Sequence, residues 1–251
     1  MIKGENLGEK IVESAKAGFE RILDLVYPKR CVVCDGITEE PKRAVCRGCE
    51  GKIVHIRAPF CMKCGKQLQA AEEELCEGCR IKRHFFVQGT ALYDYGSMAD
   101  SIFRFKYCGR QEYAAFYGRQ LAEQKAMWLG AVRPDALIPV PVHASRRRKR
   151  GYNQAELIAA ELSKHTGIPV NTTLIVRVRK TLPQKGLGGR ERQNNLKRAF
   201  KIRENDVKLK TIVIIDDIYT TGSTIDAMAE VLRTAGIQKV YFMVLAAGRG
   251  I

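Results

Sequence analysis

Two adjacent carboxylates, followed at once by a hydroxyl-rich turn, are the residues of this chain best placed to do chemistry. Asp216 and Asp217 come directly after four β-branched apolar residues, 212–215, a pattern typical of a strand buried on both faces of a parallel sheet. The turn consists of Thr220, Thr221, Gly222, Ser223 and Thr224. A helical pattern starts there, and a helix start offers unpaired N–H groups to a phosphate. Because the acidic pair is suited to ribose hydroxyls or a divalent cation, the stretch predicts a site for a phosphorylated sugar.

The same stretch resembles the phosphoribosyl pyrophosphate (PRPP) signature of type I phosphoribosyltransferases, in which an apolar run, an acidic pair and Thr-Thr-Gly-x-Thr follow one another. The resemblance implies an α/β fold with a mainly parallel sheet flanked by helices. A nucleoside-triphosphatase strand can also end in acidic residues. That interpretation requires G-x-x-x-x-G-K-[ST] earlier in the chain, and the sequence has no such run.

Eight of the nine cysteines form four Cys-x-x-Cys pairs near the N-terminus. Two thiolates in one tight turn can reach a single tetrahedral zinc ion, and a set of four leaves no position for a substrate, so the pairs predict two structural zinc sites. Sequential and cross-braced sharing of the pairs both remain open. His55 and His84 are surplus to these sets and are expected to be ordinary surface residues. The predicted zinc ligands are Cys31, Cys34, Cys46, Cys49, Cys61, Cys64, Cys76 and Cys79.

The remaining elements follow from apolar periodicity. We expect an amphipathic helix over residues 1–28, the zinc ribbons over 29–84 and an α/β domain over 85–251. Within that domain, the patterns predict strands over 88–95, 136–142, 171–178 and 239–247, helices over 100–105 and 112–128, a cationic loop over 145–154 and a mobile loop over 179–203. The expected helical core residues are Ile102, Phe103, Phe105, Phe116, Leu121 and Met127.

The net charge of +16 is large for 251 residues and predicts an anionic partner, which could be a nucleic acid, an acidic membrane surface or a polyphosphate ligand. The basic run at Arg146–Arg150 could be a solvated face or a nucleic-acid patch, but its position after a predicted strand favours pyrophosphate binding by part of it. No run of about eighteen apolar residues occurs, and no apolar segment typical of a signal peptide lies near the N-terminus. We therefore expect a cytoplasmic protein without a transmembrane segment.

Over nearly its whole length the chain resembles the ComF family of competence-associated proteins, which join a double zinc ribbon to a type I phosphoribosyltransferase domain. The resemblance is carried by the cysteine pairs, Pro139-Val-Pro141, the Arg-Arg-x-Arg-Gly-Tyr-Asn-Gln motif ending at Gln154, Gln184–Asn195 and the acidic signature. It implies that Thr220–Thr224 hold the 5′-phosphate and that Asp216 and Asp217 take the ribose hydroxyls. It also implies a pyrophosphate loop and a lid over Mg²⁺-bound PRPP. The loop contains Val140 and Pro141 with Arg147 and Arg150 beside them, and the lid carries Lys180, Gln184, Arg190 and Arg192.

Two functions compete on this basis. One is an enzyme, a phosphoribosyltransferase that passes the ribosyl group of PRPP to an acceptor that the sequence does not identify. The other is a non-catalytic protein of natural transformation that senses PRPP or binds single-stranded DNA, a role that the resemblance implies and the charge favours. The zinc ribbons could instead dock another competence protein, and the sequence does not separate that role from DNA contact.

Overall fold

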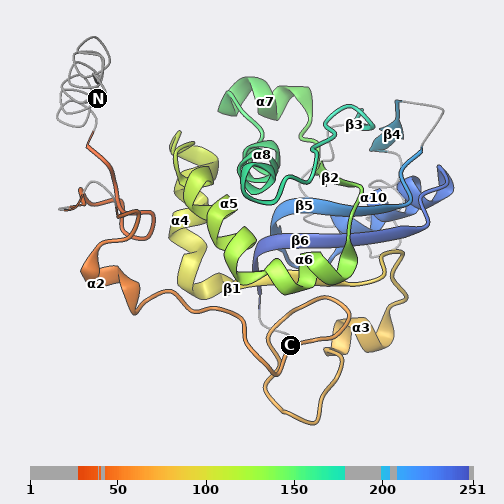
Figure 1. Ribbon diagram of the computed structural model, residues 1–251, viewed down its shortest axis with the longest axis horizontal. Helices are drawn as coiled ribbons and strands as arrows, with labels where there is room; N and C mark the ends of the chain where they lie inside the picture. The colour runs from red at the N-terminus through yellow and green to blue at the C-terminus, as the bar shows by residue number, and fades with distance from the viewer. Residues whose placement is uncertain (1–27, 39, 41–42, 179–198, 204–207, 249–251) are drawn as a thin grey trace, which may run out of the picture. The chain divides into compact units, whose positions relative to one another are not determined.

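The computed structural model describes residues 28–38, 40, 43–178, 199–203 and 208–248, and Figure 1 shows its helices and strands. The chain divides into two compact units, Met1–Lys52 and Ile53–Ile251, which are described separately. The predicted helix over residues 1–28 lies almost wholly outside the described residues, as do the predicted lid residues Lys180, Gln184, Arg190 and Arg192.

The second unit is built on a parallel four-stranded sheet. Its strands are β1 (Gly89–Asp94), β2 (Ala136–Pro139), β5 (Thr211–Tyr219) and β6 (Lys239–Ala247), in the order β1-β6-β5-β2. All pairs are parallel, so all four carboxyl ends meet at one edge. The predicted strand over 136–142 ends at Pro139 in the structure. Two prolines close together remove backbone N–H donors, which shortens the ladder.

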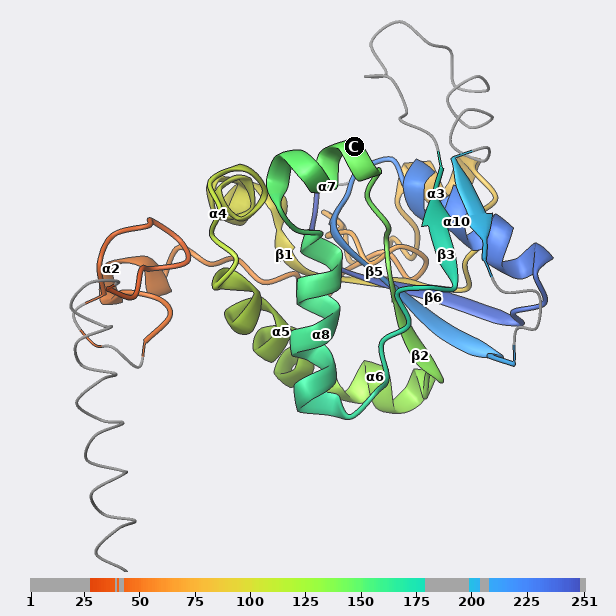
Figure 2. The ribbon, with the colours of Figure 1, turned by 90° about the horizontal axis from the view of Figure 1, so that it is seen from above.

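Side-chain alternation along β5 supplies both faces of the sheet. Residues 212–215 are fully buried, as their unbroken apolar run predicts. Ile212 and Ile214 belong to the same core cluster as Met228 and Leu232 of α10 (Ser223–Thr234). The opposite face is covered by other helices, since α8 (Gln154–Thr166) packs on β2 and β5. Figure 2 shows α8 and α10 on different sides of the strands.

Three further helices precede β2: α4 (Tyr95–Tyr107), α5 (Tyr113–Gln124) and α6 (Ala126–Val132). Two predicted core residues are wrong, because Phe103 is 56% exposed and Met127 is 91% exposed. Phe103 lies between the buried Ile102 and Phe105 on the outer side of α4. Met127 belongs to α6, which restarts after a break at Lys125 and therefore does not continue the apolar stripe of α5.

Two predicted loops contain regular structure. The cationic segment forms a short helix, α7 (Ala144–Arg150), with His143 as its N-cap and the left-handed Gly151 as its C-cap. Arginine and lysine are good helix formers, so a cationic run between two caps favours a helix. In addition, β4 (Phe200–Ile202) pairs antiparallel with β3 (Ile175–Arg177), so the end of the predicted mobile loop is a strand.

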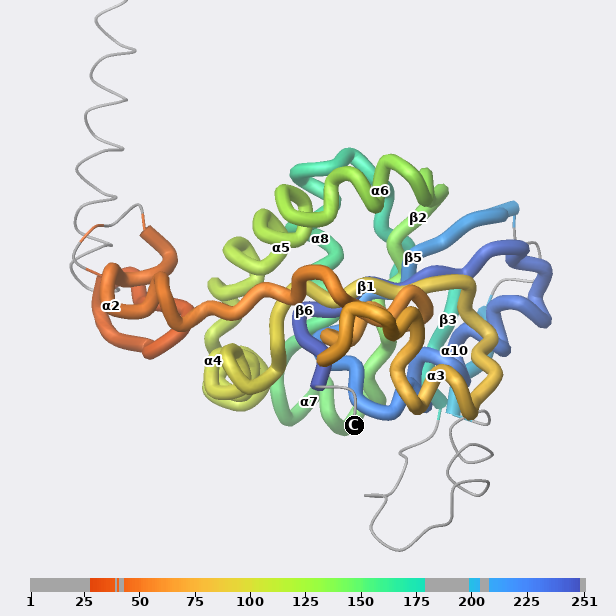
Figure 3. The backbone as a smooth tube through the Cα atoms, turned by 90° about the horizontal axis from the view of Figure 1, so that it is seen from below, coloured from red at the N-terminus to blue at the C-terminus, as the bar shows by residue number. Residues whose placement is uncertain are grey.

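Residues 53–88, which contain the second cysteine set and the short helix α3 (Glu77–Ile81), pack on the sheet and α10. Figure 3 shows this segment, in orange to yellow, across the strands. Cys61, Cys64 and Cys76 belong to the same buried cluster as Ile212 and Met228. Gly65 has a φ of 73°, and a Cβ there would lie 2.7 Å from Thr90 Cα. Only glycine therefore lets this turn lie directly against β1.

The first unit holds the other cysteine set and the short helix α2 (Arg47–Glu50). Its first turn, Cys31–Gly36, is closed by the Cys31 N–H, which donates to Gly36 O at 2.8 Å. Asp35 takes the position that corresponds to Gly65, with a φ of 64°. None of the described helices is long and apolar enough to cross a lipid bilayer.

Candidate functional site

The acidic pair lies on the last part of β5, at the edge where the four parallel strands end. Asp217 is 9% exposed, and its N–H donates to Asp216 Oδ1 at 2.9 Å. Burial and the neighbouring Asp217 charge raise the pKa of Asp216 to about 7, although Lys106 acts in the opposite direction. Two carboxylates this close repel each other unless a cation or hydrogen-bond donors lie between them. The pair is therefore suited to bind a ligand that supplies one of these.

Two cations from other elements lie beside the acidic pair. Lys106, at the end of α4, places its Nζ 2.8 Å from Asp217 Oδ1. Arg177, on β3, is close enough to Asp216 that their charges interact, and burial lowers its pKa. Its guanidinium lies 5.5 Å from the centre of the Phe200 ring. Neither residue was predicted from the sequence, because their contacts with the pair are tertiary and no spacing in the chain relates them.

The hydroxyl-rich turn joins β5 to α10 as the sequence predicts. Gly222 is the N-cap of α10 in the left-handed conformation, with a φ of 72°. A Cβ there would lie 2.8 Å from Tyr219 Cζ, so the glycine is required both by its φ and by close contact. Thr221 Oγ1 lies 2.9 Å from Ser223 Oγ. The turn thus presents hydroxyls and backbone N–H groups in front of the positive end of a helix.

The predicted pyrophosphate loop follows β2. The Val140 N–H donates to Ile215 O at 2.9 Å, which places Val140 and Pro141 next to the start of the acidic pair. Asn153 Nδ2 donates to Val140 O at 3.0 Å and holds this loop against α8. Asn153 belongs to the Arg-Arg-x-Arg-Gly-Tyr-Asn-Gln motif, but its contact with this loop was not predicted, although its place directly before a helix is typical of an N-cap.

The predicted pyrophosphate arginines lie on α7 and make contacts away from the acidic pair. Arg147 Nη1 lies 3.1 Å from Glu156 Oε1, and Arg150 Nη1 donates to Gln154 Oε1 at 3.0 Å. Arg150 also lies 4.6 Å from the centre of the Tyr107 ring. The structure thus brings together Asp216, Asp217, the turn and the β2 loop, whereas these two guanidinium groups contact α8 and α4.

The eight cysteines form two sets of four, and in each set the sulfur atoms lie within 4.8 Å of one another. The sets are sequential, which resolves the pairing: Cys31, Cys34, Cys46 and Cys49 in one, and Cys61, Cys64, Cys76 and Cys79 in the other. Cys34 and Cys46 Sγ are 3.8 Å apart, and Cys64 and Cys76 Sγ are 3.6 Å apart. A tetrahedron with Zn–S bonds of about 2.3 Å has edges of about 3.8 Å. Four thiolates at this spacing fit a structural zinc ion in each set.

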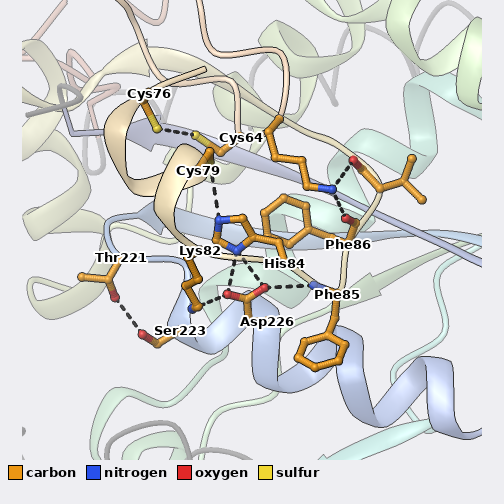
Figure 4. Close-up of polar contacts among 12 residues, drawn as sticks. Cys64, Cys76, Cys79, Lys82, His84, Phe85, Phe86, Thr221, Ser223 and Asp226 are labelled. Carbon is orange, nitrogen blue, oxygen red and sulfur yellow. Dashed lines mark hydrogen bonds and ion pairs between the residues drawn. The ribbon is translucent and has the colours of Figure 1, made fainter. Parts of the chain in front are cut away.

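A buried polar chain connects the second cysteine set with α10. His84 Nε2 lies 3.5 Å from Cys79 Sγ, and its Nδ1 lies 2.8 Å from Asp226 Oδ2 in the first turn of the helix. Lys82 Nζ lies 2.5 Å from the same carboxylate oxygen, and the Phe85 N–H donates to Asp226 Oδ1 at 3.3 Å. Figure 4 shows His84 and Lys82 converging on Asp226, with Thr221 and Ser223 at the start of the same helix.

The expectation that His84 is an ordinary surface residue is wrong, because its side chain is only 3% exposed. The expectation failed because no pattern relates His84 to Asp226, which is distant in the chain.

His55 lies 5.0 Å from Tyr93, measured between ring centres, and burial lowers its pKa. Burial raises the pKa of Asp226, but the hydrogen bonds from His84 and Lys82 outweigh it and hold the pKa of this carboxyl below its usual value.

Comparisons with known proteins agree with this architecture. Residues 22–80 match the double zinc ribbon domain, and residues 148–250 match the phosphoribosyl transferase domain. The chain is 30% identical to Competence protein F of Haemophilus influenzae, over 86% of this chain and 96% of that protein. It is 32% identical to the DNA utilization protein YhgH of Salmonella typhimurium, with the same coverage. It is 25% identical to Competence protein ComFC of Bacillus subtilis, over 82% of this chain and 89% of that protein.

Fold, cysteine sets and sequence matches together define a protein with a phosphoribosyltransferase domain and a double zinc ribbon. The parallel sheet with its helices has the predicted α/β architecture. The chain belongs to the ComF family, as the motifs of its sequence predict.

Proposed function

We propose that the protein binds PRPP at the edge of the sheet and displaces its pyrophosphate onto an acceptor. The observation that carries this proposal is the junction of β5 and α10, where Asp216 and Asp217 are followed within one turn by the left-handed Gly222 and a helix start. In the proposed complex the turn Thr220–Thr224 holds the 5′-phosphate, and the two carboxylates take the ribose hydroxyls.

The chemistry follows from the charges that develop. Loss of pyrophosphate from C1 of the ribose leaves positive charge on the sugar and negative charge on the leaving group, so groups that stabilise these charges accelerate the reaction. Mg²⁺ prefers carboxylate and phosphate oxygens, so Asp216 and Asp217 fit an ion bound with PRPP, which would neutralise negative charge on the pyrophosphate. The loop at Val140 and Pro141 lies beside them to receive that group. We assign its stabilisation to Lys180 and Arg190, and to Arg147 and Arg150, whose guanidinium groups must leave Glu156 and Gln154 to reach it.

The test is calorimetric titration of PRPP with Mg²⁺ into the double variant Asp216→Asn and Asp217→Asn. We expect binding to be abolished, because amides neither attract the cation nor accept as strongly from the ribose hydroxyls. Asp100→Asn, an exposed carboxylate on α4, is the matched control and should bind like the original protein. Unchanged affinity of the double variant would remove the assignment. Release of pyrophosphate from PRPP, screened over candidate acceptors, then tests turnover.

A second function, binding of single-stranded DNA, is favoured by one feature of the surface. Phe103 and Tyr107 are 56% and 58% exposed, and their ring centres lie 5.0 Å apart on the outer side of α4. Arg150 stacks on Tyr107 and comes from the cationic helix α7. Exposed aromatic rings next to arginines are the usual means of stacking unpaired bases. The names of the relatives, which refer to competence and DNA utilization, agree with this role.

We expect the double variant Phe103→Ala and Tyr107→Ala to bind a fluorescent oligo(dT) at least about tenfold more weakly, since stacking contributes about 1–3 kcal/mol per base. Met127→Ala is the control, because Met127 is an exposed apolar residue on another helix. Fluorescence anisotropy at several salt concentrations measures both effects. Equal affinity of the two variants would contradict DNA stacking at this surface.

A further inference from the structure

The proposed sugar-phosphate site and the proposed DNA surface meet at the last turn of α4. Lys106 points to the acidic pair, with its Nζ 2.8 Å from Asp217 Oδ1, and its side chain is only 17% exposed. The next residue, Tyr107, is 58% exposed and lies beside Phe103 on the outer side of the helix. Neighbouring residues on a helix project about 100° apart, so one turn can serve an inner and an outer site. A change at either site therefore acts on the same turn.

Arg150 lies at this junction and makes two contacts. Its guanidinium lies 4.6 Å from the centre of the Tyr107 ring, and its Nη1 donates to Gln154 Oε1 at 3.0 Å. Gln154 is 1% exposed, and its Nε2 donates to Lys106 O at 3.4 Å. One buried amide thus joins the arginine to the backbone of the turn that carries Lys106.

The segment between α7 and α8 also supports the loop that is assigned to pyrophosphate. Asn153 Nδ2 donates to Val140 O in this loop at 3.0 Å, and the Tyr152 hydroxyl donates to a backbone carbonyl of α4. Both side chains are buried, whereas Arg150 is only partly buried. Arg150 is therefore the residue of this segment whose side chain can pass from the DNA surface to the pyrophosphate loop.

The two ligands require Arg150 in different places. On the Tyr107 ring, its guanidinium adds positive charge to a surface for stacked bases and their phosphates. To stabilise pyrophosphate, the same guanidinium has to leave both Tyr107 and Gln154. PRPP also brings several negative charges close to a surface that attracts phosphate groups, and exposed charges interact over about 8 Å at physiological ionic strength. Both effects have the same sign, so each ligand disfavours the other.

We infer that PRPP and single-stranded DNA weaken each other's binding to this protein, and that Arg150 is the group for which they compete. This inference rests on the proposed function in both its parts. Coupling between two sites is reciprocal, so the factor by which PRPP weakens DNA binding equals the factor by which DNA weakens PRPP binding. A protein with this coupling binds single-stranded DNA when PRPP is scarce and releases it when PRPP is abundant.

Arg150→Gln removes the shared guanidinium, and Arg148→Gln is its matched control. Arg148 is exposed on the same helix, so both variants lose one positive charge from α7. We expect saturating PRPP with Mg²⁺ to weaken oligo(dT) binding to the original protein at least about fivefold, which is the lower end of typical coupling between sites. This factor should persist in Arg148→Gln and fall to about twofold or less in Arg150→Gln, where only the charge of PRPP remains to act.

The experiment measures the fluorescence anisotropy of labelled oligo(dT) on zinc-loaded full-length protein, with and without PRPP and Mg²⁺ at constant ionic strength. Calorimetry of PRPP with and without unlabelled oligo(dT) measures the reciprocal effect. The double variant Asp216→Asn and Asp217→Asn controls for ionic competition, because the proposed function predicts that it binds no PRPP.

Three results would overturn the inference. The first is DNA affinity of the original protein that PRPP leaves unchanged or increases. The second is an effect of PRPP that persists in the double variant, and the third is an equal factor in Arg150→Gln and Arg148→Gln. Failure of PRPP alone or of oligo(dT) alone to bind the original protein would instead overturn the corresponding part of the proposed function.

Discussion

Removal of the His84 imidazole tests whether the buried polar chain supports the second zinc site. His84→Ala deletes the contact of 3.5 Å with Cys79 Sγ and that of 2.8 Å with Asp226. Groups that contact metal ligands typically contribute 10–100-fold to metal affinity. We therefore expect the second site to bind zinc about 10–100-fold more weakly, which corresponds to about 1.4–2.7 kcal/mol. Asp226 keeps its contacts with Lys82 and the Phe85 N–H, so the fold should survive.

The measurement is a competition titration with a chromophoric zinc chelator, which reads metal affinity and not activity. The first cysteine set is an internal control, because Val54 stands five residues after Cys49, at the place that His84 takes after Cys79. His55→Ala is the control variant, since His55 contacts Tyr93. Two results would refute the reasoning. One is unchanged affinity at both sites of His84→Ala, and the other is an equal loss at both sites, which would indicate general destabilisation.

Two further predictions concern the phosphate turn and the acidic pair. Because the pKa of Asp216 is raised to about 7 and binding requires the carboxylate, PRPP affinity should fall about tenfold from pH 8 to pH 6, and calorimetry that finds equal affinities would contradict this. The raised pKa of Asp216 has the opposite effect on folding. The free energy of unfolding of the unliganded protein should decrease as the pH rises through about 7, because the folded state then has to keep a buried charge. Gly222→Ala should destabilise the protein by about 1–3 kcal/mol, because alanine is strained at a φ of 72° and its Cβ would collide with Tyr219. Denaturant unfolding beside Gly130→Ala, an open helical glycine, measures this cost, and equal midpoints would show that the turn can rearrange.

The parts of the site that are contiguous in the sequence could be predicted from it. Strand, acidic pair, turn and helix follow one another within residues 211–234, so local patterns are enough to place them. The zinc sets were also visible, because two thiolates in one turn share an ion. Lys106 and Arg177 could not be found in this way. They reach Asp217 and Asp216 from α4 and β3, and such contacts depend on how the elements pack.

The strands of the fold could also be predicted from local patterns in the sequence. Buried strands of a parallel sheet carry unbroken apolar runs, and β2, β5 and β6 were predicted from these, whereas β1 was predicted from alternation. Phe103 could not be placed in this way, since an apolar residue on a helix can face either the core or solvent. The exposure of Phe103 suggests a binding surface only because Tyr107 lies beside it and Arg150 stacks on Tyr107, and both contacts are tertiary or depend on the helix face.

The two cysteine turns differ in the residue that follows their second cysteine, which is Asp35 in one turn and Gly65 in the other. Asp35 and Gly65 have nearly the same backbone conformation, but only the residue without a side chain lets its turn rest on the backbone of β1. The second ribbon therefore belongs to the core of the second unit, and we expect its removal to expose the apolar side of the parallel sheet to water. We therefore expect a minimal folding unit to begin near residue 53, because Cys61, Cys64 and Cys76 belong to its buried core.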